Sequence, residues 1–177
     1  MLEAGFGSDP EYRAFRNTVH EWQEGDHAEI RLATDDVIAG RRWDARTQRL
    51  LRVLAEADIE APELFRGISL PIDADLDTNF GAGVDIFPKL SSFTTSIEEA
   101  GYRAARAHDK ARVGVIFQLE AGARAIPIEN LSYREDLWAE REWYTSGRFV
   151  GLGLTERSGV VWARIRHEEV HHARESR

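Results

Sequence analysis

The chain has 177 residues, a length that favours one domain and allows it to bury a sizeable core. Hydrophobic residues make up 42% of the chain and charged residues 31%, a balance typical of soluble globular proteins. The net charge of −8 disfavours a general nucleic-acid-binding surface, which is normally basic, and the absence of cysteine excludes disulfides, thiolate metal ligands and cysteine nucleophiles.

The first third of the sequence predicts three helices. The first begins at Asp9-Pro10, where the aspartate offers an N-cap and the proline suits the first helical position, and it ends at Glu24-Gly25. Its apolar residues recur at helical spacing, and they are Tyr12, Phe15, Val19 and Trp22. We expect the other two helices over residues 26–39 and 44–57.

Strands dominate the rest of the sequence. We expect them over residues 63–70, 90–96, 113–119, 125–128, 142–151 and 159–166. Between these strands the pattern predicts a loop with a short helix over 71–83, a helix over 97–107 and an exposed connection over 130–139. Helices followed by a run of strands are typical of the α+β class. No repeat or linker interrupts the pattern, so we expect a single domain over 1–177, with a helical cap at 1–60 and a β-rich core at 61–177.

Two carboxylates one residue apart, Glu140 and Glu142, lie at the start of a predicted strand. Side chains at i and i+2 of a strand share a face, so we expect both carboxylates to project into one site. Two acids on one face are costly to ionise together unless a cation, a polar ligand or solvent stabilises them. The pair is therefore a candidate for general-base and cation-stabilising chemistry, although such pairs are also common on solvated surfaces.

Two further motifs precede the acids. Arg66-Gly67 lies on one predicted strand, and the run Ser-Phe-Thr-Thr-Ser at 92–96 lies on a second. In order and spacing the three motifs resemble the Arg-Ser-Glu class of mono-ADP-ribosyltransferases, which includes bacterial toxins, phage enzymes and vertebrate ectoenzymes. The resemblance spans residues 64–166. It implies an ADP-ribosyltransferase-like split core, with a mixed and antiparallel β-sheet, next to the N-terminal helical region.

The resemblance implies that NAD is the substrate and that its ADP-ribose passes to a target protein, with release of nicotinamide and without a metal. Breaking the bond between nicotinamide and ribose builds positive charge on the sugar. A carboxylate aimed at that charge stabilises the transition state, and by resemblance this is Glu142. Glu140 would orient or deprotonate the acceptor. In the family, glutamate at that position accompanies an arginine acceptor, so we expect arginine or another guanidinium.

The implied binding residues lie around these acids. Arg66 would hold the pyrophosphate of NAD with its forked guanidinium, and Gly67 would let the backbone approach the nicotinamide amide. The hydroxyls of Thr94, Thr95 and Ser96 would hydrogen-bond the catalytic glutamate, with Thr94 standing where the family usually has serine.

Three aromatic residues complete the implied site. Tyr102 is the residue that we expect to stack on nicotinamide. Tyr133 and Trp138 lie in the stretch 131–139, which matches the substrate-recognition turn of the family. Their implied role is contact with the target protein.

Each motif also has a structural interpretation when it is taken alone. An arginine between apolar residues of a strand, such as Arg66, is also typical of a buried ion pair. A Ser/Thr-rich run such as 92–96 is common in strands, because threonine suits a pleated surface. Only the joint occurrence of the three motifs favours a catalytic site.

Two other functions stay open at this point. The first is an NAD glycohydrolase, in which water replaces the acceptor. The second is a non-catalytic phage structural or interaction module with the same fold. An active transferase would be the toxic domain of a bacterial effector, with an immunity protein as a further partner, or a phage-encoded modifier of host proteins.

One motif points to different chemistry. Residues 167–171 match H-E-x-x-H, the pattern of zinc metalloproteases, which requires a helix and a third ligand. Only His172 and Glu175 follow as ligand types, so a catalytic zinc site at this end of the chain is disfavoured.

The sequence also bears on location. No apolar run approaches the ~20 residues that span a bilayer. The N-terminus has neither a basic segment nor an apolar core, so we expect no signal peptide and no membrane partner. The expected place of action is the cytoplasm of the host or target cell.

Overall fold

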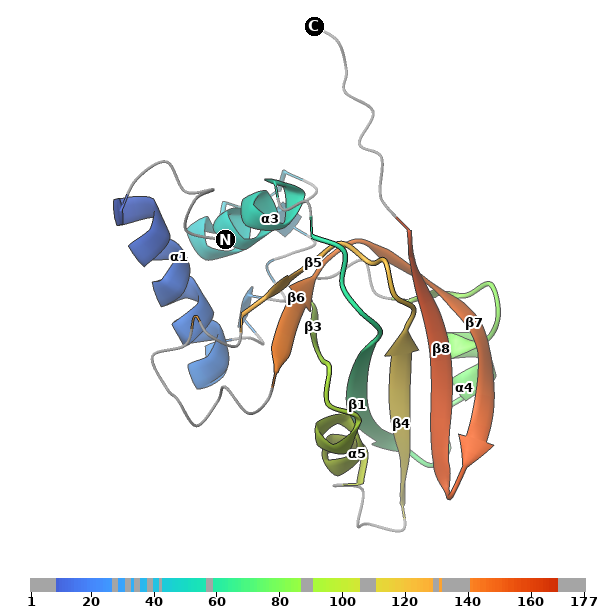
Figure 1. Cartoon of the computed structure of the whole chain (residues 1–177). Helices are drawn as coiled ribbons and strands as arrows, with labels where there is room; N and C mark the ends of the chain where they lie inside the picture. Colours follow the sequence, from blue (N-terminus) through green and yellow to red (C-terminus); the bar gives the residue numbers. More distant parts are fainter. Residues whose placement is uncertain are drawn as a thin grey trace, which may run out of the picture. The chain divides into compact units, whose positions relative to one another are not determined.

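The computed structural model describes residues 9–26, 29–30, 33, 36–37, 40–41, 43–56, 59–86, 91–105, 111–128, 131 and 141–168 (Figure 1). The chain divides into two compact units. The first unit comprises Met1–Ile59, Lys89–Thr95 and Arg124–Ser146, and the second comprises Glu60–Pro88, Ser96–Ala123 and Gly147–Arg177. The helical N-terminal region therefore shares its unit with two later segments of the chain.

Two predicted helices of the first unit are confirmed. Helix α1 (Asp9–Glu21) begins at the predicted N-cap and ends before the predicted Glu24-Gly25, and one π-helical turn, η2 (Trp22–Asp26), follows it across that position. Helix α3 (Ala45–Glu56) is capped by Asp44, whose Oδ1 accepts a hydrogen bond from the backbone N–H of Thr47 at 2.8 Å. Of the helix expected over 26–39, the described residues beyond η2 are helical and the others lie outside the described part.

The strands of the first unit are β3 (Ser91–Thr94), β5 (Ala125–Pro127) and β6 (Glu142–Thr145). Strand β6 is the central one, because it pairs antiparallel with β3 on one side and with β5 on the other.

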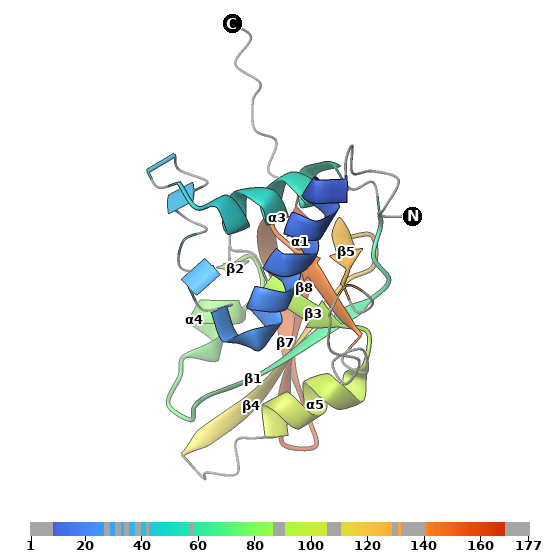
Figure 2. The ribbon, with the colours of Figure 1, turned by 90° about the vertical axis from the view of Figure 1, so that its left-hand side faces the viewer.

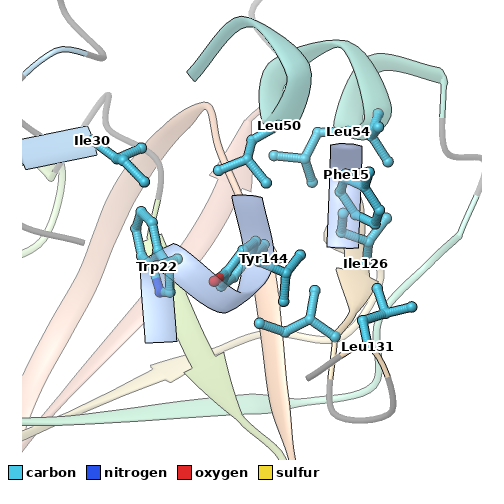
Figure 3. Packing of buried hydrophobic residues seen from close by; sticks show 11 residues of the cluster. Phe15, Trp22, Ile30, Leu50, Leu54, Ile126, Leu131 and Tyr144 are labelled. Atoms are coloured by element: carbon cyan, nitrogen blue, oxygen red, sulfur yellow. The ribbon is translucent and has the colours of Figure 1, made fainter. Parts of the chain in front are cut away.

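Helices α1 and α3 lie over the strands of the first unit (Figure 2). A hydrophobic core joins these strands to the helices (Figure 3). Its buried residues are Phe15, Val19, Trp22, Ile30, Leu50, Val53, Leu54, Ile126, Ile128, Leu131 and Tyr144. The apolar stripe predicted for the first helix is thus the face of α1 that packs inward. Burial of Leu131 also shows that the predicted exposed connection turns inward at its one described residue.

Tyr144 lies at the centre of this core. Its ring centroid is 4.8 Å from that of Trp22, and its side chain is fully buried. Burial raises the pKa of the phenol well above its ordinary value, and the negative charge of Glu142 adds to the shift. Within the described part of the chain the Tyr144 hydroxyl has no hydrogen-bond partner.

The second unit contains the longer strands. They are β1 (Leu64–Pro71), β2 (Asp85–Ile86), β4 (Arg112–Leu119), β7 (Arg148–Arg157) and β8 (Val160–Glu168), and they lie side by side in the order β2-β7-β8-β4-β1. The β4–β8 pair is parallel and the other pairs are antiparallel. The helices of this unit are α4 (Leu76–Phe80), which is the short helix predicted within 71–83, and α5 (Ile97–Ala105).

The expectation of one strand over 142–151 is wrong. Residues 142–145 form β6, which pairs with β3 and β5, whereas β7 begins at Arg148 and pairs with β2 and β8. Gly147 lies between them with a φ of 133°, a conformation open to glycine and rare for other residues. The chain therefore leaves one set of strands and enters another at this residue.

Helix α5 packs directly on β1 and β4 (Figure 1). Ala100 and Ala104 form its buried face, and Gly67 of β1 lies beneath them. A Cβ atom on Gly67 would overlap the carbonyl oxygen of Ala100, and one on Gly114 of β4 would lie 2.9 Å from the carbonyl oxygen of Ala104. The two glycines let the helix approach the strands at backbone contact distance.

These elements confirm the predicted α+β class with its antiparallel and mixed strand pairing and its N-terminal helical region. Within the described part of the chain, no helix has both the length and the apolar character that a bilayer crossing needs.

We expect Gly67→Ala to lower the free energy of unfolding by about 3 kcal/mol. The new methyl group would overlap the backbone of α5, which cannot rotate away as a flexible side chain could. Denaturant unfolding followed by circular dichroism measures the change. Gly101→Ala is the matched control, since no neighbouring atom of the described residues lies within 4 Å of a Cβ at that position of α5, and it should stabilise the protein by up to about 1 kcal/mol. Equal effects of the two variants would contradict the packing described here.

The buried phenol predicts a pH effect. Its folded-state pKa is raised, whereas in the unfolded chain a tyrosine ionises near its ordinary value of about 10. Above that pH the unfolded state holds fewer protons, so the contribution of Tyr144 to stability falls as the pH rises.

Ultraviolet absorbance at alkaline pH should show one phenol that ionises only when the protein unfolds. Tyr144→Phe should abolish this late step while the other phenols titrate as before. A late step of the same size in the variant would show that another tyrosine causes it.

Candidate functional site

One residue of the acidic motif and one of the hydroxyl motif, Glu142 and Thr94, lie on neighbouring strands of the first unit. Thr94 of β3 is directly opposite Glu142 of β6 in the antiparallel register. Directly opposite residues have their Cβ atoms about 4.5–5.5 Å apart on one face of a sheet. The backbone N–H of Thr95 donates to the carbonyl oxygen of Arg141 at 3.3 Å, which extends the pairing beyond the strand. The pairing thus brings together two motifs separated by about fifty residues of sequence.

Glu142 is held from two further directions. Its backbone carbonyl accepts a hydrogen bond from the N–H of Ile128 at 2.9 Å. Its Oε2 accepts a hydrogen bond from Nε2 of Gln23, in the π-helical turn η2, at 3.1 Å. Glu142 is half-buried, so dissolved salt screens its interaction with Gln23 less than it would screen the same interaction at the surface.

Gln23 does not appear among the residues predicted from the sequence motifs. A signal for it exists, because Gln23 lies four positions after Val19, where the helical stripe would place another apolar residue. A polar amide at an inward-facing position requires a hydrogen-bond partner. That partner is the carboxylate of Glu142.

The premise that an extended strand runs back from Glu142 through Arg141 is wrong. Strand β6 begins at Glu142, and Arg141 before it has a φ of 47°, which is left-handed and not extended. The alternation of side chains along a strand therefore does not reach back through Arg141. Glu140, Tyr133 and Trp138 lie outside the described residues, and their roles stay predictions.

The predicted NAD-binding residues Arg66 and Gly67 lie on β1 of the second unit. Arg66 is half-buried and opposite Phe117 of β4. The side of Gly67 that lacks a side chain faces α5, so this glycine has a structural requirement as well as the binding role implied by the resemblance. Arg66 is the cation on β1 that could hold a pyrophosphate.

Ser96 caps α5. Its Oγ accepts a hydrogen bond from the backbone N–H of Glu99 at 3.1 Å and donates one to the Glu98 carboxylate at 3.1 Å. The hydroxyl opposite Glu142 in the register is that of Thr94. Thr94 is therefore the predicted hydroxyl residue that the strand register places opposite the glutamate, and the binding roles of Thr94, Thr95 and Ser96 stay predictions.

Tyr102 is exposed over 58% of its surface. It is two residues along the helix from both Ala100 and Ala104, the buried residues of α5. Tyr102 is therefore on the side of α5 turned away from the strands. Its expected contact with nicotinamide stays a prediction.

The H-E-x-x-H pattern does not lie on the helix that a zinc site needs. His167 and Glu168 are the last residues of β8, a strand, and the remainder of the motif lies outside the described residues. Among the residues that the structure describes, no group of three His, Asp or Glu side chains is placed to hold a metal ion.

Comparisons by sequence and by structure give different results. No protein-family model matches the chain, and no curated protein matches it by sequence. Solved structures do match. The Vis toxin, an ADP-ribosyltransferase from Vibrio splendidus, aligns with a TM-score of 0.66 and 14% identity over 97% of this chain and 79% of that one.

Two other bacterial proteins give similar values. An ADP-ribosyltransferase from Clostridium botulinum aligns with a TM-score of 0.61 and 12% identity, over 90% of this chain and 87% of that one. Exoenzyme S from Pseudomonas aeruginosa aligns with a TM-score of 0.58 and 14% identity, over 92% of this chain and 79% of that one. The chain therefore has the fold of the ADP-ribosyltransferase toxins.

Proposed function

We propose that this protein is a mono-ADP-ribosyltransferase of the Arg-Ser-Glu class, which transfers ADP-ribose from NAD to an arginine or another guanidinium of a target protein. The observation that carries the proposal is the register that sets Thr94 opposite Glu142, in a chain with the fold of ADP-ribosyltransferase toxins. A hydroxyl paired with a half-buried carboxylate is the arrangement that the class requires of its second and third motifs.

Two structural neighbours support the choice of substrates. Exoenzyme S was solved bound to carba-NAD, together with a human 14-3-3 protein. The Vis enzyme was solved in complex with agmatine, which carries a guanidinium group. Proteins of this fold thus bind an NAD analogue in one case and a guanidinium compound in another.

In the proposed reaction the bond between nicotinamide and C1′ of the ribose breaks, and nicotinamide leaves with the bonding electrons. The carboxylate of Glu142 stabilises the positive charge that develops on the sugar, and its partner Thr94 helps to orient it. Arg66 neutralises the pyrophosphate and keeps that part of NAD in place.

The acceptor completes the reaction. A guanidinium nitrogen forms the new bond to C1′ and gives up a proton, which Glu140 accepts. Tyr133 and Trp138 are proposed to contact the target protein, and Tyr102 to stack on nicotinamide. The physiological setting is a bacterial toxin or effector, with an immunity protein as a further partner, or a phage modifier of host proteins.

Glu142→Gln should reduce release of nicotinamide from NAD by about 10²- to 10³-fold, because the neutral amide cannot stabilise the sugar cation. Labelled NAD with agmatine as acceptor measures both cleavage and transfer. Glu56→Gln, an exposed position at the end of α3 in the same unit, is the matched control and should retain full activity. Equal rates in Glu142→Gln and the wild type would overturn the proposal.

Glu140→Gln should separate the two halves of the reaction. Transfer to agmatine should fall by about 10²-fold or more, while hydrolysis of NAD by water falls much less, because only the acceptor needs the base. The ratio of ADP-ribosyl-agmatine to free ADP-ribose is the measurement. A wild-type protein that yields only free ADP-ribose would instead be an NAD glycohydrolase.

A further inference from the structure

The hydrogen bond from Gln23 to Glu142 joins two residues that are 119 positions apart in the sequence. An ionised carboxylate only accepts hydrogen bonds, so the amide of Gln23 must present its NH₂ group to Glu142. The bond fixes one carboxylate oxygen, Oε2, and thereby limits rotation of the carboxylate plane. A hydrogen bond to a charged group is worth about twice one between neutral groups.

Packing alone does not favour a glutamine at position 23, because burying one of its polar atoms costs free energy of folding. It follows Trp22, whose ring packs against Tyr144 in the hydrophobic core (Figure 3). The Oε1 atom of Gln23 is buried and has no hydrogen-bond partner within the described part of the chain. An apolar side chain of the same size would avoid that cost, so packing does not explain why an amide occupies this position.

The local backbone offers a second, independent observation. Helix α1 does not end in an α-helical turn but in the π-helical turn η2, which contains Gln23. Single π-helical turns are rare in proteins as a whole, but many of those that do occur lie at functional sites, because the wider turn redirects the side chains that it carries. Here the turn carries both Trp22, which packs on the ring of Tyr144, and Gln23, which donates to Glu142.

We propose that Gln23 is a positioning residue of the active site, which holds the carboxylate of Glu142 in the orientation that the ribose requires. This inference rests on the proposed function of Glu142. It assigns to the N-terminal helical region a part in catalysis that none of the three sequence motifs contains.

The test is a series of three substitutions at Gln23, assayed for cleavage of NAD. Gln23→Met keeps the size and removes the donor, and kcat should fall about tenfold with the KM for NAD changed less than twofold. Gln23→Asn keeps a neutral amide donor and should retain more of kcat than Gln23→Met. Gln23→Glu places a second carboxylate against Glu142 and should lose more than Gln23→Met. Gln48→Met in α3 is the matched control and should leave kcat unchanged.

A purely structural role predicts the opposite pattern. In that case Gln23→Met would lower the unfolding temperature and affect kcat and KM together. We expect its unfolding temperature to stay unchanged or to rise, because the buried and unsatisfied Oε1 atom is removed. Equal kcat values across the three variants, or a kcat loss that follows the stability loss, would overturn the inference.

A double-mutant cycle of unfolding free energy measures the contact without NAD. Gln23→Glu should destabilise the protein when Glu142 is present and much less in the Glu142→Gln background. Equal destabilisation in both backgrounds would show that residues 23 and 142 do not interact, and would overturn the inference. If the wild-type protein neither binds nor cleaves NAD, the proposed function fails, while the cycle still decides whether Gln23 holds Glu142.

Discussion

The first unit depends on the antiparallel pairing of β6 with β3 and β5. This strand has only four residues, yet one of its faces carries both Tyr144, which is fully buried, and Glu142, which is half-buried. The hydrogen bonds of the pairing fix the register, and the register places Thr94 opposite Glu142. A slip of one residue would move Tyr144 out of the core and Glu142 to the other face. The packing of Tyr144 and the placement of Glu142 are therefore secured by the same constraint.

The second unit relies on close approach of backbones. Gly67 and Gly114 lie under α5, and Gly151 of β7 lies so close to Gly81 that a Cβ atom there would overlap its carbonyl oxygen. Close packing of this kind tolerates no added methyl group without movement of main chain. The glycine that follows Arg66 is consequently under a packing constraint, whatever part it has in binding NAD.

Much of the fold could be predicted, because long elements carry a strong local signal. The helical spacing of Phe15 and Val19 located α1, and the β-branched run around Val115 located β4. The two-residue strand β2 is too short for any periodicity, and the break at Gly147 depends on which strands each half pairs with. Thr94 and Glu142 were predicted as site residues from their motifs, but their pairing is a property of the sheet and not of either motif.

What the sequence determined by itself is the type of each long element and the set of chemical groups available for a site, since both follow from residue type and local spacing. Only the tertiary structure decided which of those groups lie together. It showed that Arg141 is left-handed, so that the strand that carries Glu142 begins only at that glutamate, and that Gln23 donates to Glu142 from the π-helical turn η2. Such contacts join residues that no local pattern relates, because they form only when the core draws distant segments together.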